Sequence, residues 1–285
     1  MKNSHINAAV SAALQEDLGH GDITTSVLVP ERHKSTAVIF AKETAVLSGT
    51  GLLKEVFRQL DPQFRITLKK ADGDALAPGD VIARLHGRTR VMLAGERLAL
   101  NYLSYLSAIA TRTKSFCDAV KPYRVRIMDT RKTTPGLRVF ERHAVVCGGG
   151  VNHRFGLYDM VLVKDNHRAV MSKGSSLADM VRGIRLKTKL KIEVEVDSLE
   201  ELKDVLGASP DLILLDNMDA RQLKEAVLIT KSRARGKKRP LLEASGGITL
   251  RNVHAMAATG VDRISIGALT HSRQVVDMSL EVVDA

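Results

Sequence analysis

The stretch 191-KIEVEVDSLEELKDVLGASPDLILLD-216 decides the fold class of this 285-residue chain. It begins with a short apolar run, KIEVEVD, continues through the helical pattern 198-SLEELKDVLG-207, and ends in a second apolar run, LILLD. A strand, a helix and a second strand in this order imply a right-handed crossover between two parallel strands. The stretch therefore predicts an α/β architecture.

The same alternation continues on both sides of this stretch. Short runs typical of buried strands, RVRIMD, MVLVKD, LLEAS and RISIG, join the two runs above, and helical segments such as 219-DARQLKEAVLIT-230 separate them. Six or seven such units within about 160 residues predict a compact or incomplete α/β barrel. A doubly wound open sheet is the alternative.

The first part of the chain has a different character. A helical pattern over 5–18 precedes short β-like runs between 35 and 90, with one helix-like insert at 50–60. Residues 91–120 predict one long helix or a helix pair at a hinge between two domains. We therefore expect an N-terminal α+β, sandwich-like domain at 1–112, an α/β-barrel domain at 113–270, and a C-terminal segment at 271–285 that packs back on the N-terminal domain.

The composition narrows the class of protein. Hydrophobic residues make up 44% of the chain and charged residues 26%, which is ordinary for a globular protein. The two cysteines, Cys117 and Cys147, are too few for a disulfide framework or a cysteine-rich metal site. We expect a cytoplasmic protein with neither a signal peptide nor a membrane span, because no run of 18 uncharged apolar residues occurs.

The formal net charge of +11 raises the alternative of a nucleic-acid-binding protein. Aromatic residues are only 4% of the chain and Trp is absent, so stacking platforms for single strands are poorly supplied. Part of the excess charge lies in the basic run 231-KSRARGKKR-239, which predicts a surface loop. The excess of Lys and Arg can equally serve anionic small molecules or plain solubility.

Polar residues gather where the predicted strands end. In a parallel barrel the carboxyl ends of the strands meet on one face, and ligands bind there. The residues at these ends are Thr130, Arg131 and Lys132; Lys164; Glu193 and Glu195; Asp216; Ser245, Gly246 and Gly247; and Gly267 followed by His271. Their common position predicts one binding site.

The residue types at these ends indicate the ligand. The turns 245-SGG-247 and 267-GALTHS-272 let backbone N–H groups approach a phosphate. Six cations, Arg131, Lys132, Arg138, His153, Arg154 and Lys164, fall within about 35 residues and favour a polyanionic ligand. Two carboxylates can hold Mg²⁺ through water, bind sugar hydroxyls or stabilise positive charge on a reacting carbon. Asp216 supplies one of them, and periodicity does not decide between Glu193 and Glu195 for the other.

With these residues assembled, the sequence resembles the quinolinate phosphoribosyltransferase family, the decarboxylating nicotinate-nucleotide pyrophosphorylases of NAD synthesis. The matching motifs run along nearly the whole chain. They are EDLGHGDITT (16–25), GERLALNYLSYLSAIAT (95–111), DTRKTTPGLR (129–138), CGGGVNHRFGLYD (147–159), VKDNH (163–167), EVEVDSLEEL (193–202), LLDN (214–217), EASGGI (243–248) and SIGALTHS (265–272).

The resemblance implies a fold, an assembly and a reaction. The fold is an N-terminal α+β domain with a seven-stranded, incomplete α/β barrel, and the assembly is a homodimer or a higher oligomer. In the reaction, quinolinate attacks C1′ of phosphoribosyl pyrophosphate, pyrophosphate leaves with Mg²⁺, and the 2-carboxylate departs as CO₂. The product is nicotinate mononucleotide.

The resemblance also implies the role of each site residue. Thr130, Arg131, His153, Arg154 and Lys164 would bind quinolinate, together with Arg97 from the neighbouring subunit. Lys132, Glu195, Asp216, Ser245, Gly246, Gly247, Gly267 and His271 would bind phosphoribosyl pyrophosphate. Catalytic roles fall to Lys132, Lys164, Glu195 and Asp216, and Glu195 and Asp216 would hold Mg²⁺ through water.

Two further alternatives stand beside this family, and the first of them shares its fold. A homologue associated with molybdenum transport is expected to differ around VKDNH and TRKT, and both motifs are intact here. A transferase acting on nicotinate would have fewer carboxylates to hold and would need fewer cations. Both observations favour the quinolinate enzyme.

Overall fold

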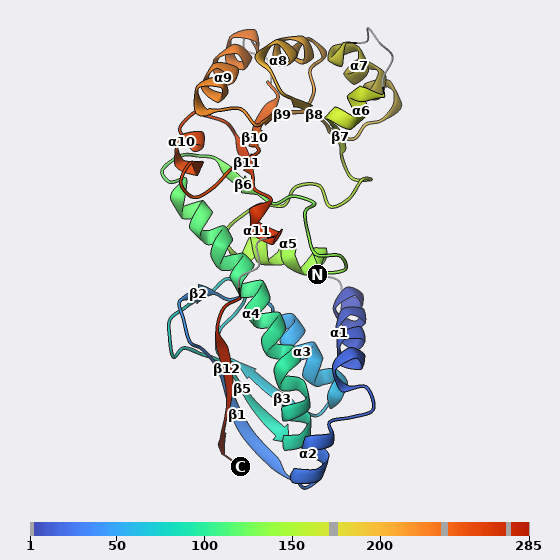
Figure 1. The fold of residues 1–285 in the computed structure, drawn as a ribbon, viewed down its shortest axis with the longest axis vertical. Helices are drawn as coiled ribbons and strands as arrows, with labels where there is room; N and C mark the ends of the chain where they lie inside the picture. The colour runs from blue at the N-terminus through green and yellow to red at the C-terminus, as the bar shows by residue number, and fades with distance from the viewer. Residues whose placement is uncertain (1–2, 171–175, 235–238, 272–274, 285) are drawn as a thin grey trace. The chain divides into compact units, whose positions relative to one another are not determined.

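The computed structural model describes residues 3–170, 176–234, 239–271 and 275–284, which form two compact units (Figure 1). The first unit comprises Met1–Lys114, Lys132–Gly149 and Leu269–Ala285, and the second comprises Ser115–Arg131 and Gly150–Ala268. The first unit thus draws on three separate parts of the chain, including Lys132–Gly149, which the sequence assigns to the barrel. The predicted boundaries at 112 and 270 stay a prediction.

A four-stranded antiparallel sheet forms the framework of the first unit. Its order is β12-β1-β5-β3, with the bounds β12 (Met278–Asp284), β1 (Lys34–Ala41), β5 (Val81–Arg88) and β3 (Arg65–Leu68). Alternate residues of β1, such as Ala37 and Ile39, are fully buried, so one face of the sheet covers the core. A small second sheet pairs β2 (Ala45–Val46) with β4 (Ala75–Leu76).

Helices pack with these sheets. They are α1 (Asn3–Leu18), α2 (Ile23–Leu28), α3 (Thr50–Leu60), α5 (Arg138–Cys147) and most of α4 (Thr89–Ala119) and α11 (Ala268–His271). The apolar side chains of α3 are grouped on one face, and Leu53 and Phe57 are completely buried there. Of the two predicted arrangements for residues 91–120, the structure has the single long helix, α4.

The second unit is built on a parallel sheet of six strands in its described residues. The strands are β6 (Arg126–Met128), β7 (Val161–Val163), β8 (Ile192–Val196), β9 (Leu212–Asp216), β10 (Leu241–Ser245) and β11 (Arg263–Ser265). All six predicted strands are thereby confirmed. Every residue of β8 is buried, as expected for a parallel strand covered on both faces.

The order of this sheet, β6-β11-β10-β9-β8-β7, places the first strand of the unit beside the last. In a doubly wound sheet the first strand lies inside the sheet, so the observed order differs from that alternative. Beyond β6, one isolated parallel bridge joins Met128 to Val151. Among the described residues Val151 adds this single bridge and no further strand, so the seven-stranded barrel stays a prediction.

Helices connect successive strands of the second unit, and some of them begin at a serine N-cap. They are α6 (Asp165–Ala169), α7 (Leu177–Lys187), α8 (Leu199–Val205) with a short 3₁₀ turn at Leu206–Ala208, α9 (Ala220–Ala234) and α10 (Val253–Ala257). Ser198 caps α8 by accepting the N–H of Glu201 at 3.2 Å. Figure 1 shows α7, α8 and α9 following one another along the sheet.

The basic run 231–239 is a loop only in part. Helix α9 continues four residues beyond the predicted end at 230, so Lys231 and Arg233 are helical. Residues 235–238 lie outside the described residues, and Arg239 forms an ion pair with Asp262 at 2.7 Å. In the described ranges, no helix combines the length and the apolar character needed to cross a membrane.

Candidate active site

The strand-end residues of the second unit lie along one edge of its parallel sheet. Lys164 directly follows β7 and is the N-cap of α6, Glu195 is the fourth residue of β8, and Asp216 and Ser245 are the last residues of β9 and β10. Asp216 and Ser245 are direct partners in the strand register. The parallel register therefore brings these groups together, as the sequence predicts.

An amine and two carboxylates meet at this edge. The Nζ of Lys164 forms an ion pair with the carboxylate of Glu195, whose side chain is only 7% exposed. Burial, and then the negative charge of Glu195, raise the pKa of Asp216, while Lys164 lowers it. Two carboxylates that repel each other beside one amine form a site suited to a cation or to developing positive charge.

The turn after β10 has a backbone that only glycine fits. Gly246 has φ of +92°, and a Cβ there would lie 2.1 Å from Oδ1 of Asn217. The N–H of Asn217 donates to the carbonyl of Ser245 at 2.9 Å, which ties this turn to the end of β9. Gly247 also has a positive φ, +60°, but a Cβ there would meet open space. A ligand can therefore approach the backbone closely at Gly247.

Two arginines of the second unit repel each other. Arg154 is 9% exposed and donates from Nη1 to the carbonyl of Met160 at 3.1 Å. Burial, and then the positive charge of Arg131, lower the pKa of Arg154. Arg131 itself is exposed just beyond the end of β6. An anion bound near both guanidinium groups would relieve this repulsion.

His153 lies between two buried carboxylates. Its Nε2 is 3.0 Å from Oε2 of Glu193 and 3.2 Å from Oε1 of Glu243, and its side chain is 7% exposed. Burial lowers the pKa of His153, but the hydrogen bonds and charges of these two carboxylates outweigh burial and raise that pKa to about 10. The backbone N–H of His153 donates to the buried carboxylate of Asp129 at 2.6 Å, which fixes the position of the residue on the sheet.

This arrangement separates the two glutamates of β8. Glu193 faces His153, whereas Glu195, one pleat closer to the carboxyl end of the strand, faces Lys164. Glu195 is therefore the member of the pair at the sheet edge where Asp216 and Ser245 also lie.

Comparison with known protein families gives two matches that together span most of the chain. The N-terminal domain of quinolinate phosphoribosyl transferase matches residues 22–107, and its C-terminal domain matches residues 109–281. The chain belongs to the quinolinate phosphoribosyl transferase family. The resemblance inferred from the motifs is thereby confirmed.

Individual members of the family are similar over nearly their full length. A nicotinate-nucleotide pyrophosphorylase (carboxylating) of Mycobacterium leprae is 41% identical over 279 residues, covering 96% of this chain and 95% of its own. A probable enzyme of the same name from Bacillus subtilis is 40% identical over 269 residues, covering 94% and 90%. The solved structure of the nicotinate-nucleotide pyrophosphorylase of Francisella tularensis is 35% identical with a TM-score of 0.90, covering 99% and 97%.

The predicted quinolinate phosphoribosyl transferase site residues are divided between the two units. Thr130, Arg131, His153, Arg154, Lys164, Glu195, Asp216, Ser245, Gly246, Gly247 and Gly267 belong to the second unit, and Arg97, Lys132 and His271 belong to the first. Arg97, Lys132 and His271 are all exposed, and the carbonyl of Lys132 accepts a hydrogen bond from the hydroxyl of Thr270 at 2.6 Å. The roles of these residues stay predictions.

The motifs did not identify Glu243 as a partner of His153. It precedes Ser245 in EASGGI, and it faces the same interior as Glu193 because β8 and β10 both flank β9. The sequence does contain a signal for this pairing. Glutamates inside two otherwise apolar strands indicate buried charges that need a shared cationic partner.

Proposed function

We propose that this protein transfers the phosphoribosyl group of phosphoribosyl pyrophosphate to quinolinate with decarboxylation, giving nicotinate mononucleotide, pyrophosphate and CO₂. The observation that carries the proposal is the edge of the parallel sheet where Lys164, Glu195, Asp216 and the turn after β10 lie together. The family of the chain and the names of its relatives support the same reaction.

Quinolinate is a dicarboxylate, so its binding requires several fixed cations. Arg131 and Arg154, whose positive charges repel each other, would each hold a carboxylate, with Lys164 and Thr130 beside them. His153, held in place by Glu193 and Glu243, would contribute its positive charge to the quinolinate site. Arg97 would come from the neighbouring subunit.

The phosphoribosyl group would bind on the other side of the same edge. The 5′-phosphate would lie at Ser245, Gly246 and Gly247, with Gly267 and His271, because the open backbone at Gly247 admits an anion. Lys132 would lie near the phosphoribosyl group, and the carboxylates of Glu195 and Asp216 would bind the ribose hydroxyls.

Mg²⁺ is the cofactor that the family implies, and the residues present fit it. Glu195 and Asp216 offer the oxygen donors that Mg²⁺ prefers, and the repulsion between them is what a cation relieves. When bound, Mg²⁺ would neutralise charge on the pyrophosphate leaving group. Glu195 and Asp216 would hold it through water.

The side chains have little covalent chemistry to perform. The pyridine nitrogen attacks C1′ as the bond to pyrophosphate breaks, and the two carboxylates stabilise the positive charge that develops on the ribose. The ring nitrogen is then cationic, so it stabilises the carbanion left when the 2-carboxylate departs as CO₂, and a proton completes the product. The arginines and lysines act by positioning the two anions.

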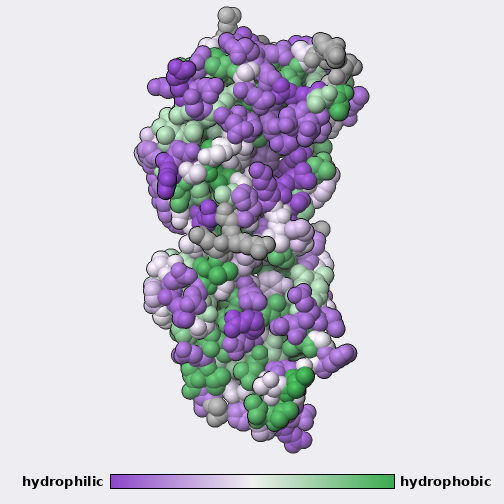
Figure 2. All heavy atoms as spheres, viewed as in Figure 1, coloured by the Kyte–Doolittle hydropathy of each residue, from purple (hydrophilic) through white to green (hydrophobic). Residues whose placement is uncertain are grey.

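A dimer completes the proposal. Helix α2 exposes three large apolar side chains, Ile23, Val27 and Leu28, at 74–80%, and Figure 2 shows apolar surface at the end of the first unit where this helix lies. Burial of this patch against a second copy, together with the exposed Arg97, would support the predicted homodimer. The incomplete seven-stranded barrel, with Val151 as its seventh position, and the cytoplasmic location are parts of the same proposal.

The test is an assay with two candidate acids. Purified protein is incubated with phosphoribosyl pyrophosphate, Mg²⁺ and either quinolinate or nicotinate, while CO₂ and mononucleotide are measured together. We expect product from quinolinate alone, with one CO₂ per mononucleotide. Product from nicotinate without CO₂, or no turnover by folded protein, would overturn the proposal.

Arg131→Ala tests the quinolinate site directly. A substrate carboxylate left without its partner should cost more than about 2 kcal/mol of transition-state stabilisation, measured as the loss in kcat/KM for quinolinate. Arg124→Ala is the matched control. Arg124 is also an exposed arginine, but it precedes the start of β6, whereas Arg131 follows the end of that strand. A loss below about fivefold for Arg131→Ala would contradict the assigned role.

A further inference from the structure

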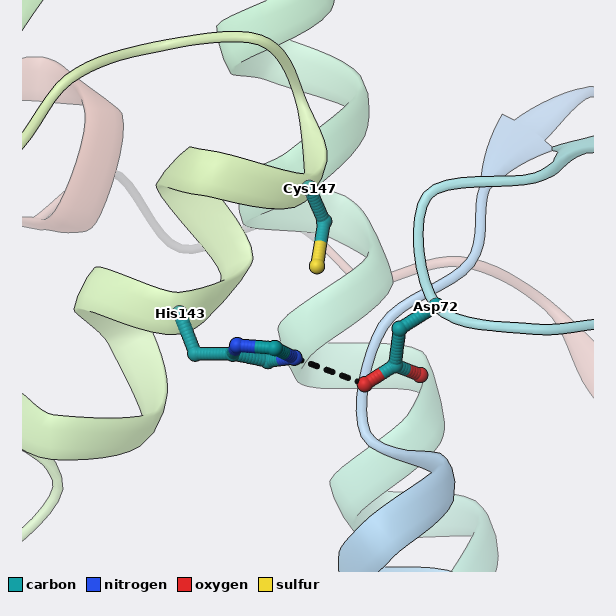
Figure 3. Close-up of side chains that lie close together, drawn as sticks. All are labelled: Asp72, His143 and Cys147. Carbon is teal, nitrogen blue, oxygen red and sulfur yellow. Dashed lines mark hydrogen bonds and ion pairs between the residues drawn. The ribbon is translucent and has the colours of Figure 1, made fainter. Parts of the chain in front are cut away.

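A second cluster of reactive side chains lies in the first unit and consists of Asp72, His143 and Cys147 (Figure 3). Each residue offers one donor atom, a carboxylate oxygen, an imidazole nitrogen and a thiol sulfur respectively. These three atoms all lie within 4.8 Å of one another. Donors of these three types converging on one point match the ligand set of zinc-class ions.

The helix α5 supplies two of the donors. His143 and Cys147 are four residues apart, which places their side chains one turn apart on the same face. The Nε2 of His143 is 2.8 Å from Oδ2 of Asp72. Figure 3 shows the sulfur of Cys147 directed toward this same end of the imidazole ring.

The loop that carries Asp72 is held in place by its backbone. The N–H of Thr50 donates to Oδ1 of Asp72 at 3.0 Å, so the other carboxylate oxygen is left facing His143. The N–H of Gly73 donates to the carbonyl of Leu47 at 2.8 Å, and Gly73 adopts a φ of +96°. The third donor is therefore fixed independently of α5.

The end of α5 is equally well defined. A Cβ at Gly148 would lie 2.3 Å from the carbonyl oxygen of Ala110, so the chain just after Cys147 packs directly on the backbone of α4. This contact fixes the last turn of α5 and with it the position of the thiol. A preorganised set of donors loses little freedom when an ion binds.

The cluster is both accessible and close to the size of a metal site. The side chains of Asp72 and His143 are 16% and 32% exposed, so an ion can enter and water can complete its coordination. Zn–S bonds of about 2.3 Å and Zn–N bonds of about 2.0 Å place tetrahedral donors roughly 3.3–3.8 Å apart. The 2.8 Å between Nε2 of His143 and Oδ2 of Asp72 would widen by about 0.5 Å, and the separations from the sulfur, at most 4.8 Å, would shorten by no more than about 1.0–1.5 Å.

We propose that Asp72, His143 and Cys147 bind a divalent transition-metal ion of the zinc class, with water as the remaining ligand. The proton between His143 and Asp72 leaves when the ion enters, as does the thiol proton. Imidazole and thiolate select against Mg²⁺, so the ion differs from the one expected beside Glu195 and Asp216. The bound ion joins the loop between β3 and β4 to α5 and stabilises the first unit.

A reactive thiol is the other chemistry that these residues could support. In a catalytic Cys-His-Asp arrangement the imidazole uses its two opposite nitrogens, one toward the carboxylate and one toward the thiol. Here the carboxylate and the sulfur are directed toward the same end of the ring (Figure 3). That geometry favours a shared metal ion over a relay through the ring.

The test titrates the full-length, chelator-treated and fully reduced protein with Co²⁺, followed by competition with Zn²⁺. A thiolate ligand gives a near-ultraviolet charge-transfer band, so we expect this band to saturate at one Co²⁺ per chain and to disappear when Zn²⁺ is added. Loss of an outer partner of a ligand already weakens binding 10–100-fold, so Cys147→Ser and Asp72→Asn should each weaken Zn²⁺ binding by at least about tenfold.

Cys117→Ser is the matched control, because Cys117 is the other cysteine of the chain and lies outside the cluster. It should leave the band and the affinity unchanged, and circular dichroism should show every variant folded. A cobalt complex without the thiolate band, or equal affinity in Cys147→Ser and the unmodified protein, would overturn the proposal. So would alkylation of Cys147 by iodoacetamide at the same rate with and without Zn²⁺, which would identify a reactive thiol instead.

Discussion

Three titratable side chains share the interior of the second unit at His153, Glu193 and Glu243. Both glutamates are completely buried, and each would be costly there without a cation. Burial, and then the charge of Glu243, raise the pKa of Glu193, so the pair of carboxylates repel each other. Arg263, 3.8 Å from Glu243, adds a second positive charge at the edge of the group. His153 therefore stabilises the fold as well as facing the proposed ligand.

We predict that His153→Ala lowers the free energy of unfolding by about 3–5 kcal/mol, because it leaves two buried carboxylates without their shared partner. Urea unfolding at neutral pH measures the loss. Adding Glu193→Gln to that variant should restore part of the stability, since only one buried charge then remains. A loss below about 1 kcal/mol for His153→Ala would contradict this account of the cluster.

Gly246, in the turn after β10, gives a second test at this scale. Gly246→Ala places a Cβ against Oδ1 of Asn217 and should distort the turn, raising the KM for phosphoribosyl pyrophosphate at least about tenfold. Gly183→Ala is the control for packing, because Gly183 lies in α7, outside the proposed site, and a Cβ there meets open space. Steady-state kinetics with varied phosphoribosyl pyrophosphate distinguishes the two. An equal and small effect of both substitutions would exclude this turn from substrate binding.

Helices α1 and α3 are joined by one carboxylate. Glu55 on α3 accepts two hydrogen bonds from Arg58, at 2.6 and 2.7 Å, one from Gln59 at 2.8 Å, and one from Asn7 of α1 at 3.1 Å. The hydrogen bonds from Arg58 lower the pKa of Glu55 most strongly, burial opposes them, and the net result is a pKa of about 2. The ionised form is thus favoured in the folded protein.

We predict that Glu55→Gln lowers the unfolding free energy by about 1 kcal/mol at neutral pH. Because the folded pKa lies below the ordinary value of 4.5, the contribution is fully present above pH 4.5 and is lost as the pH falls toward 2. Urea unfolding between pH 7 and pH 3 should show the variant and the parent converging. Glu31→Gln, at an exposed position between α2 and β1, serves as the control.

The strands of the second unit were predictable because a parallel strand is buried on both faces. Runs such as LILLD lack the alternation of polar and apolar residues that marks a half-exposed strand. Because helical segments separate these runs, right-handed crossovers between parallel strands are the simplest topology. Strand β12 was not predicted as a strand, because its outer half, with exposed Glu281 and Val283, lacks the burial that makes a run recognisable. Its partner β1 lies more than two hundred residues earlier in the chain, so the sequence around 278–284 does not indicate the pairing.

For the molecule as a whole, the sequence located the candidate site better than it described the contacts within it. Strand ends are fixed by topology, so Lys164, Glu195 and Asp216 could be placed together in advance. The clusters at His153 and His143 join segments far apart in the chain, and the choice between Glu193 and Glu195 depends on which pleat faces which neighbour. Such choices are made by packing, which no spacing in the sequence reports.

The proposed dimer predicts that two inactive variants restore each other. Arg97→Ala removes the residue that a subunit would donate, and Asp216→Asn disables the site that receives it. Co-expression gives half mixed dimers, each with one intact site, so about one quarter of the sites should be active while each variant alone is inactive. Assays of the co-purified mixture measure the recovery. Activity no greater than that of the separate variants would show that Arg97 does not act across subunits.

The pairing of β1 with β12 bears on how the protein is made. Residues 34–41 leave the ribosome more than two hundred residues before their partner at 278–284 is synthesised. Until then one edge of β1 has no backbone partner on that side, and strand edges of this kind promote association between nascent chains. The sheet of the second unit is likewise incomplete until β11 has been synthesised, because β6 pairs with β11. A nascent chain from which residues 278–284 have not yet emerged therefore lacks the β12 partner of β1, and the first sheet stays incomplete until that segment is available.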